Sequence, residues 1–366
     1  MNDPGRRASS AALLPGLMLL VAACGGGTVA SPTAPAASVP PASTSGATVA
    51  PSPSAAVSYP LELTDAAGEV HRFEEPPARI GCWWLGCSEV LADLGVRPHA
   101  AGAEISGPLF FPDGTGPVVT ISDGNSVEEW AAAEPDVLVG DAWGVGGDNA
   151  EAFAQVAPVF HLHTPFYDGH ETETLRGIDA YAENLRIMGK LTLRTAEAEA
   201  AIARFEALLA DLKEVAPAGA GDTVIALLWA SNEGQYFLLE AESPFCDAIE
   251  GASLGLCIDE QGEINAEAFL GIDPDWIAYI AFGEDSWQKR PPDPVWQQLS
   301  AVEAGQVYDS NGRGNGSTRI FCCSLRGLEH ALLEYAHEVW GEAAGVPDPG
   351  PAYDYDPRDS AVLTGS

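Results

Sequence analysis

Two stretches with the same spacing decide how this sequence is organised: INAEAFLGIDPDWI at 264–277 and VEEWAAAEPDVLV at 127–139. In each, a glutamate (Glu267 or Glu128) is followed after six residues by Pro-Asp and an apolar pair. Each stretch predicts a short amphipathic helix, a Pro-Asp turn and a buried strand. A single unit of this kind is common in proteins and would mean little. Two of them in one chain predict two structurally related halves.

The N-terminal 58 residues lie outside the predicted fold. Arg6 and Arg7 precede an apolar run too short to span a membrane, so residues 1–23 are predicted to be an export signal. The run ends on Val21-Ala22-Ala23-Cys24, which resembles a bacterial lipobox. Cys24 is therefore expected to carry the lipid of an extracytoplasmic, membrane-anchored lipoprotein; the alternative is an ordinary signal peptide with an incidental cysteine. Residues 24–58, rich in Ala, Pro, Ser and Thr, predict a tether spanning roughly 30 Å.

The charge balance excludes one class of partner. Lys and Arg total 17 against 53 Asp and Glu, for a net charge of −36. A nucleic-acid-binding protein is excluded, because a phosphate backbone requires a basic surface. The acidity fits solubility, a salty or acidic habitat, or a cationic ligand.

The remaining chain is long enough for two domains and alternates predicted strands with helices. We predict an N-terminal α/β lobe at 59–173, a C-terminal α/β lobe at 216–345 and a flexible tail at 346–366. Between the lobes, 174–215 has helical periodicity and predicts a long rigid connecting helix. A break near Thr192–Thr195 is left open, because Thr195 could cap a second helical segment. The predicted fold class is two lobes with mainly parallel sheets, whose strand ends face each other across a cleft.

Within the lobes, the predicted strands and helices follow from hydrophobic periodicity and turn residues. In the first lobe, LELTD and EVHRF predict a hairpin, and Ser88 is a candidate cap for a helix over Glu89–Leu94. The other predicted strands there are 79–82, 100–104, 118–121 and 156–164. In the second lobe the predicted strands are 223–230, 235–240, 276–282 and 306–309, and the predicted helices are 245–251, 295–302 and 325–340.

From about residue 59 to 345, the chain resembles the periplasmic substrate-binding proteins that deliver iron–siderophores, haem or cobalamin to ABC importers. The matching features are LTDAAGEVHRFEEPPARI, Ser88-Glu89-Val90-Leu91, the two Pro-Asp units and the long central helix. The resemblance implies a class III binding-protein arrangement, in which a rigid helix joins two lobes. It also implies that Glu128 and Glu267 dock onto arginines of the two permease subunits. Otherwise each Glu is a solvated first-turn residue favoured by the helix dipole, and Glu129 competes with Glu128 for the first assignment.

The resemblance places ligand contacts on loops that follow strands. Aromatic faces on these loops suit large organic-shelled ligands, and arginines suit carboxylate or catecholate oxygens. The expected ligand-binding residues are Trp83, Trp84, Trp143, Trp229, Tyr236, Trp287, Arg313 and Arg319. Core packing is the alternative for each Trp, and solvent exposure is the alternative for each Arg.

Six cysteines besides Cys24 predict disulfides in an exported protein. Cys246–Cys257 would close a surface loop, and Cys82–Cys87 and Cys322–Cys323 would be local bridges. The last four also admit a soft-metal site across the cleft.

Three histidines, His161, His163 and His170, admit a zinc site but lie away from the predicted ligand loops, so we interpret them as surface residues. No catalytic motif is recognisable, which argues against an enzyme. We therefore expect a monomeric lipoprotein that binds an iron–siderophore complex, without a cofactor, and hands it to a permease dimer. Cobalamin or haem is the next alternative, and a bare metal ion follows.

Overall fold

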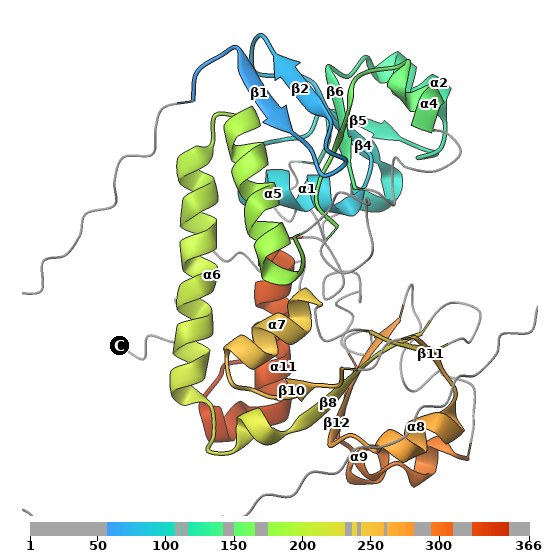
Figure 1. The fold of residues 1–366 in the computed structure, drawn as a ribbon, viewed down its shortest axis with the longest axis vertical. Coiled ribbons are helices and arrows are strands. Elements are labelled where there is room, and N and C mark those ends of the chain that lie inside the picture. Colours follow the sequence, from blue (N-terminus) through green and yellow to red (C-terminus); the bar gives the residue numbers. More distant parts are fainter. Residues whose placement is uncertain are drawn as a thin grey trace, which may run out of the picture. The chain divides into compact units, whose positions relative to one another are not determined.

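The computed structural model describes residues 57–106, 111, 116–141, 150–164, 175–230, 236–239, 243–259, 262–281, 294–309 and 324–350. In these residues two α/β lobes are present, each with its own sheet (Figure 1). The predicted fold class is confirmed.

The N-terminal lobe is built on a five-stranded sheet in the order β5-β4-β3-β6-β7, and all its neighbouring strands are parallel. The predicted hairpin is present as β1 paired antiparallel with β2. The elements are β1 Leu61–Thr64, β2 Val70–Phe73, β3 Ile80–Cys82, α1 Leu85–Asp93, β4 Ala100–Gly102, a 3-10 turn at Ala103–Ile105, β5 Val119–Ile121, α2 Val127–Ala133, β6 Val137–Gly140, α4 Ala150–Ala154 and β7 Val159–His161.

The C-terminal lobe has a six-stranded mixed sheet in the order β11-β9-β8-β12-β13, with β10 pairing β8. Strands β10, β12 and β13 run parallel to the sheet's first strand, β8, while β9 runs antiparallel to it. The elements are a 3-10 turn at Ala220–Asp222, β8 Val224–Ala230, β9 Tyr236–Leu238, α7 Pro244–Gly251, β10 Leu256–Cys257, β11 Gly262–Ile264, α8 Ala266–Ile272, β12 Trp276–Ala281, a 3-10 turn at Trp296–Gln298, α9 Ser300–Ala304, β13 Val307–Asp309 and α11 Leu325–Ala344.

Alternation along the buried strands explains why each sheet carries helices on both faces. Val137 and Val139 of β6 pack into one core cluster, while Leu138 between them packs into another. Gly81 allows the same close layering in β3: a side-chain carbon at this position would lie 2.8 Å from Leu138 and 3.0 Å from the ring of Trp130. A strand that is apolar on both faces is typical of parallel sheets.

The helix predicted over Glu89–Leu94 begins a turn earlier than expected. Helix α1 starts at Leu85, and Ser88, the predicted cap, is a fully buried residue inside it. The chain therefore passes from β3 to α1 through only Trp83 and Trp84. A second difference is that the helix predicted over 295–302 is a 3-10 turn followed by the short α9.

The predicted connecting helix over 174–215 is divided into two helices, α5 at Gly177–Leu191 and α6 at Thr195–Val215. The break occurs where the sequence left one open. Leu193 adopts a left-handed backbone conformation with φ of 60°, and α5 then packs beside α6 (Figure 1). Thr195, the candidate cap, is instead the first helical residue, and its neighbour Arg194 occupies the cap position without a side-chain hydrogen bond.

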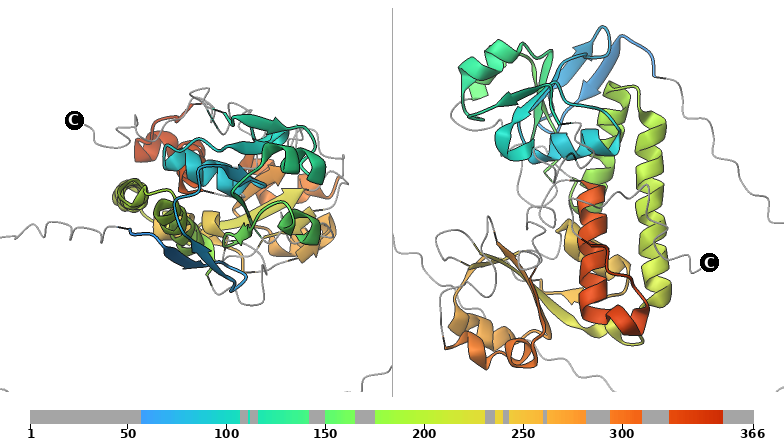
Figure 2. Two further views of the ribbon diagram at one scale, coloured as in Figure 1. Left: turned by 90° about the horizontal axis from the view of Figure 1, so that it is seen from above. Right: turned by 180° about the vertical axis from the view of Figure 1, so that it is seen from behind.

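One hydrophobic cluster runs through both lobes. It includes residues of β3 and α1, of α5 and α6, and of β8, α7 and α11. Helix α6 contacts α1 of the first lobe as well as α7 and α11 of the second, and the rear view in Figure 2 shows α6 alongside α11. Because a shared close-packed core resists deformation, the two lobes are held by packing as well as by the covalent connection.

None of the helices in the described part of the chain has the length and apolar character that a membrane crossing requires.

Candidate functional site

The order of the N-terminal sheet reverses between β3 and β6. Strands β4 and β5 extend from one side of β3, whereas β6 and β7 extend from the other. In open parallel sheets, ligands bind beyond the carboxyl ends of the strands at such a reversal. Here the residues that leave those two strands are Trp83 and Trp84 after β3 and Asp141 after β6. Both tryptophans are among the ligand-binding residues predicted from the sequence.

Trp83 and Trp84 form a stacked aromatic pair at this edge. Their ring centroids are 6.4 Å apart and their planes are 28° from parallel. The Trp83 ring also meets the edge of Phe153 of α4 at 5.5 Å. Each ring is half-buried. Trp83 packs against the hydrophobic cluster that contains Trp130 and Leu138, on one face of the sheet. Trp84 packs on the other face, against the core shared by both lobes. The pair therefore forms an aromatic surface across the end of the sheet.

A disulfide encloses this pair. The structure joins Cys82, the last residue of β3, to Cys87 in the first turn of α1, with the two Cα atoms 5.2 Å apart. Both cysteines are fully buried. The Trp83 backbone N–H donates to the carbonyl of Val139 in β6 over 2.9 Å. The four residues between the cysteines are thus held at both ends of the loop.

A buried tyrosine lies near Glu89 of α1 and near Asp141, the residue that follows β6. Tyr181 of α5 is 1% exposed, and its hydroxyl has no hydrogen-bond partner among the described residues. Burial raises the pKa of Tyr181 well above its ordinary value, and the nearby carboxylates of Glu89 and Asp141 raise it further. Its hydroxyl therefore stays protonated and remains a hydrogen-bond donor at this edge.

The C-terminal lobe brings Trp229 and Tyr236 to the carboxyl end of β8, where Ala230 pairs with Tyr236 and Trp229 with Phe237. Their side chains serve different faces of the sheet. Trp229 packs against the shared core and lies 5.2 Å from the ring of Phe237. Tyr236 packs against a separate hydrophobic cluster of the second lobe, and its ring meets the Trp296 ring edge-on with the centroids 5.2 Å apart. Both remain half-buried, so they take part in core packing as well as lying at the expected edge.

Several predicted residues lie outside the described part of the chain. They are the lipidation residue Cys24, the ligand residues Trp143, Trp287, Arg313 and Arg319, the Cys322–Cys323 pair and His170.

The two Pro-Asp units fold alike, at the opposite edge of the sheets. Helix α2 is capped by Ser126 and helix α8 by Asn265, each accepting from the N–H three residues on. Each helix ends on an acidic residue in the left-handed conformation, Glu134 with φ of 49° and Asp273 with φ of 44°. A proline follows in both units. The strand that comes next pairs with the first strand of its sheet: β6 pairs with β3 in the first lobe, and β12 pairs with β8 in the second.

The Asp of each unit forms hydrogen bonds with the backbone at the amino end of a neighbouring strand. The backbone N–H of Asp136 donates to the carbonyl of Arg79, and its carboxylate accepts from the Arg79 N–H over 2.9 Å. Asp275 exchanges the same two bonds with Val224, at 2.9 and 2.8 Å. Partial burial acts to raise the pKa of Asp136, but hydrogen bonds from Arg79 hold it below its ordinary value. These aspartates are structural, which leaves the glutamates for another role.

Glu128 and Glu267 are both exposed in the first turns of α2 and α8. Glu129 is committed within its own lobe, because its carboxylate accepts from the N–H and the hydroxyl of Ser122 at 2.6 and 2.5 Å. Ala268 stands at the equivalent position of the second unit. The choice between Glu128 and Glu129 therefore favours Glu128.

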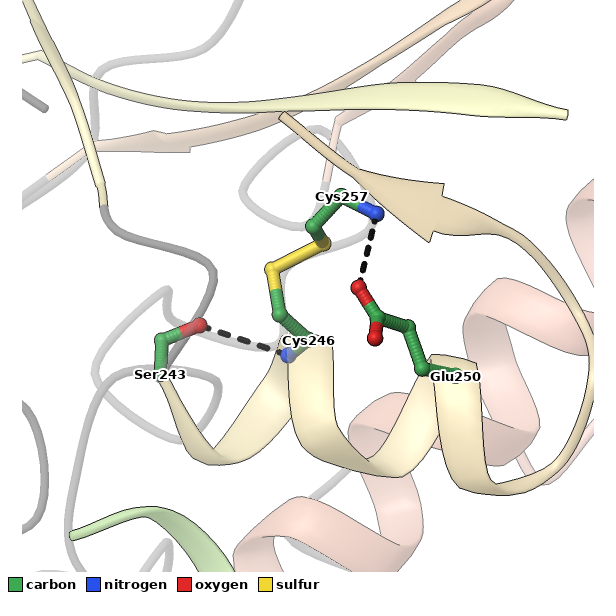
Figure 3. Close-up of a disulfide and its surroundings, with 4 residues drawn as sticks. All are labelled: Ser243, Cys246, Glu250 and Cys257. Carbon is green, nitrogen blue, oxygen red and sulfur yellow. Dashed lines mark hydrogen bonds between the residues drawn. A yellow bond between two sulfur atoms is a disulfide. The ribbon is translucent and has the colours of Figure 1, made fainter. Parts of the chain in front are cut away.

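The second disulfide lies away from the aromatic edge. Cys246 in α7 is joined to Cys257 in β10, which pairs with the amino end of β8 (Figure 3). Ser243 caps α7 by accepting from the Cys246 N–H over 3.3 Å, and Glu250 accepts from the Cys257 N–H over 3.1 Å. This bridge braces the helix and strand of the second lobe.

His161 and His163 have structural backbone roles. The His161 N–H donates to Asp65 of the hairpin, and the His163 N–H donates to Asn184 of α5. Among the residues that the structure describes, no group of three or more His, Cys, Asp or Glu is placed to hold a metal ion.

Sequence analysis missed a polar contact between the lobes. The Ser324 hydroxyl, which caps α11 of the second lobe, donates to Glu89 of α1 in the first lobe over 2.7 Å. Nearby, Arg204 of α6 donates to Glu329 of α11 over 3.2 Å. Glu89 and Ser324 lie 235 positions apart, and no local signal in the sequence links them.

Comparison with known proteins identifies the family and the fold of the chain. A family model described as "Periplasmic binding protein" matches residues 87–312. No curated protein matches the sequence. Among solved structures, the triscatecholate siderophore binding protein FeuA from Bacillus subtilis, complexed with ferri-bacillibactin, matches with a TM-score of 0.60 at 16% identity, covering 76% of this chain and 97% of that one.

Two further structures give similar values. Staphylococcus aureus SirA complexed with staphyloferrin B matches with a TM-score of 0.58 at 14% identity, covering 76% of this chain and 97% of that one. A periplasmic solute binding protein from Mycobacterium smegmatis matches with a TM-score of 0.59 at 17% identity, covering 78% and 97%. At these identities the likeness establishes the fold.

Proposed function

The chain belongs to the periplasmic binding protein family, and we propose that it captures a ferric siderophore complex and delivers it to an ABC permease. The observation that carries the proposal is the Trp83–Trp84 pair at the strand-order reversal of the first sheet. Flat aromatic faces bury the organic shell of a chelate. Structures of the same fold, FeuA and SirA, hold ferri-bacillibactin and staphyloferrin B.

The ligand is held without chemistry by loops of both lobes. Trp83 and Trp84 supply the wall from the first lobe, and Trp229 and Tyr236 lie at the corresponding edge of the second. Trp143, Trp287, Arg313 and Arg319 complete the proposed set, and the arginines neutralise the oxygens of the chelate.

Delivery uses the two exposed glutamates. Glu128 and Glu267 stand at equivalent positions of the two folded units, so they suit two equivalent subunits of a permease. Complementary charge at such a contact fixes register and raises the encounter rate.

Protein purified from its own host is expected to carry an iron chelate, detectable by native mass spectrometry with metal analysis. A bound corrin or haem would instead contradict the siderophore assignment. In titrations with ferric bacillibactin and ferric staphyloferrin B, binding should quench tryptophan fluorescence. Trp83→Ala should weaken that binding roughly 5- to 30-fold, since it removes an aromatic contact worth about 1–2 kcal/mol.

The matched control is Trp276→Ala. Trp276 is also half-buried but begins β12, at the amino edge of the second sheet. Its removal should leave affinity unchanged. Equal losses in both variants would show that the effect comes from general destabilisation, and the aromatic surface would lose its proposed role.

A lipid on Cys24 is proposed to anchor the protein outside the cytoplasm, with residues 24–58 as the tether. The support is the short apolar run that ends on Ala22-Ala23-Cys24 and the extracytoplasmic family. Cys24→Ser is expected to move the protein from the membrane fraction to the soluble fraction of the host, because acyl chains supply the membrane affinity. A Cys24→Ser protein that still sediments with membranes would contradict the anchor.

A further inference from the structure

Helix α1, like α5, α6 and α9, begins without a side-chain cap. The caps of α2, α7, α8 and α11 are Ser126, Ser243, Asn265 and Ser324, and each accepts a hydrogen bond from its own first turn. The cap position of α1 is Trp84, which makes no such bond, and the first turn of α1 contains no acidic residue. Uncapped amino ends of helices fray readily, because their first N–H groups lack partners. The Cys82–Cys87 disulfide ties this uncapped end of α1 to β3.

The loop held by that disulfide carries the aromatic surface. Trp83 and Trp84 pack against two different hydrophobic clusters, so no single cluster holds both rings. The Trp83 indole N–H has no hydrogen-bond partner among the described residues, although it is buried. Trp83 is also constrained by stacking on Trp84, by the edge-on contact with Phe153 and by one backbone hydrogen bond to Val139. Without the bridge, the first turn of α1 and the strand end move independently, and each ring gains freedom.

We propose that the Cys82–Cys87 disulfide is a positioning element of the ligand site, which pre-orders Trp83 and Trp84 for the chelate. The inference rests on the proposed function, because it assigns the two rings to the ligand. Ordering a large side chain on binding weakens affinity, and a site already ordered avoids this loss. For two tryptophan side chains, the affinity lost without the bridge is expected to be roughly 5- to 100-fold.

The second disulfide provides a matched control. Cys246 and Cys257 also join a helix to a strand, and all four cysteines belong to the same core cluster. The Cys246–Cys257 loop is the longer one, with a sequence separation of 11 against 5. In the chain-entropy view its removal costs at least as much stability. Affinity and stability should therefore separate between the two pairs of variants.

The test compares Cys82→Ala/Cys87→Ala with Cys246→Ala/Cys257→Ala in the full chain. Kd for ferric bacillibactin and ferric staphyloferrin B is measured by tryptophan quenching, and hydrogen exchange of the ligand-free proteins is measured by mass spectrometry. The first variant should bind 5- to 100-fold more weakly and exchange the amides of 83–86 faster. The second should keep the original affinity and the original exchange at 83–86. If the alanine pair fails to fold, Cys82→Val/Cys87→Ala restores part of the lost volume.

The outcomes separate the two proposals. Unchanged affinity in the Cys82→Ala/Cys87→Ala protein, or an equal loss in both variants, overturns the positioning role. If the unmodified protein binds neither ferric chelate, the siderophore assignment fails for these probes, and hydrogen exchange alone then decides the inference. Unchanged exchange at 83–86 overturns it in that case.

Discussion

A protein carrying both Glu128→Lys and Glu267→Lys is expected to bind its ligand normally and to lose at least about nine-tenths of its uptake activity in the host. Both side chains are exposed, and both project from first turns that begin with the same cap geometry. Reversing two charges at the proposed docking surface would replace attraction with repulsion, which slows encounter and misaligns the partners. Because both sites lie at the amino edges of the sheets, ligand affinity should not change.

The control for this experiment is Glu206→Lys/Glu214→Lys, which makes the same change in total charge on the exposed face of α6. Uptake should stay near normal in that protein. The two single variants, Glu128→Lys and Glu267→Lys, should each reduce uptake by less than the pair. If the docking variant transports normally, or if it loses ligand affinity by the same factor as transport, the two glutamates have no docking role.

The repeated unit was predictable because its signals are local. Spacing between Glu, Pro-Asp and an apolar pair specifies a helix, a turn and a strand within fourteen residues, and both copies have this structure. The left-handed residues at Glu134 and Asp273 were not predicted, since glycine or asparagine is the usual occupant of that position. The roles of Asp136 and Asp275 were also not predicted, because their partners Arg79 and Val224 are distant in the sequence.

The division of the connector illustrates a different limit. Helical periodicity continues across 174–215, and the sequence offered only a threonine as a sign of the break. The structure turns the chain at Leu193 and returns α6 alongside α5. The pair of helices α5 and α6 is packed against α7 and α11, and the local sequence does not reveal these contacts. Tertiary packing thus overrode a continuous helical pattern.

The burial of polar side chains in α1 could likewise not be predicted from the sequence. Trp83 and Trp84 were identifiable because they follow a predicted strand, and their position at the strand-order reversal then followed from the sheet topology. Ser88 was predicted as a helix cap, and nothing in the sequence marked Glu89 or the carboxylate of Asp93 for burial. They became buried because α1 is packed between α5, α6 and α11, an arrangement that depends on chain segments from both lobes.

Asp93, the last residue of α1, leads to a second large expected effect. Both carboxylate oxygens are buried and have no hydrogen-bond partner among the described residues. Burial, with a smaller contribution from the nearby Glu89 and Glu329, raises the pKa of Asp93 to about 7 against the attraction of Arg326 and Arg204. These groups come from α1, α6 and α11, so Asp93 belongs to the polar contact between the lobes.

The direction of the pH dependence follows from this raised pKa. In the unfolded chain Asp93 ionises near its ordinary value of 3.8, whereas the folded protein resists ionisation until about pH 7. The unfavourable charge is therefore absent below about pH 4, grows between pH 4 and 7, and is complete above that. The contribution of Asp93 to stability falls as pH rises through this window.

Asp93→Asn is expected to raise the free energy of unfolding by roughly 2–4 kcal/mol at pH 8 and to change it little near pH 4. Asn keeps the shape of Asp but cannot ionise, so the difference between the two proteins should grow as the pH rises. Urea unfolding from pH 4 to 8 measures this difference, with Asp211→Asn on the exposed face of α6 as the control for the same chemical change. An Asp93→Asn protein whose stability follows pH as the original protein does would mean that folding does not raise the pKa of Asp93, and one that is less stable at pH 8 would mean that the buried carboxylate is favourably held. In that case α1 and α11 would be joined by a charge that the contact between the lobes requires, and the repulsion from Glu89 and Glu329 would be outweighed by Arg326 and Arg204.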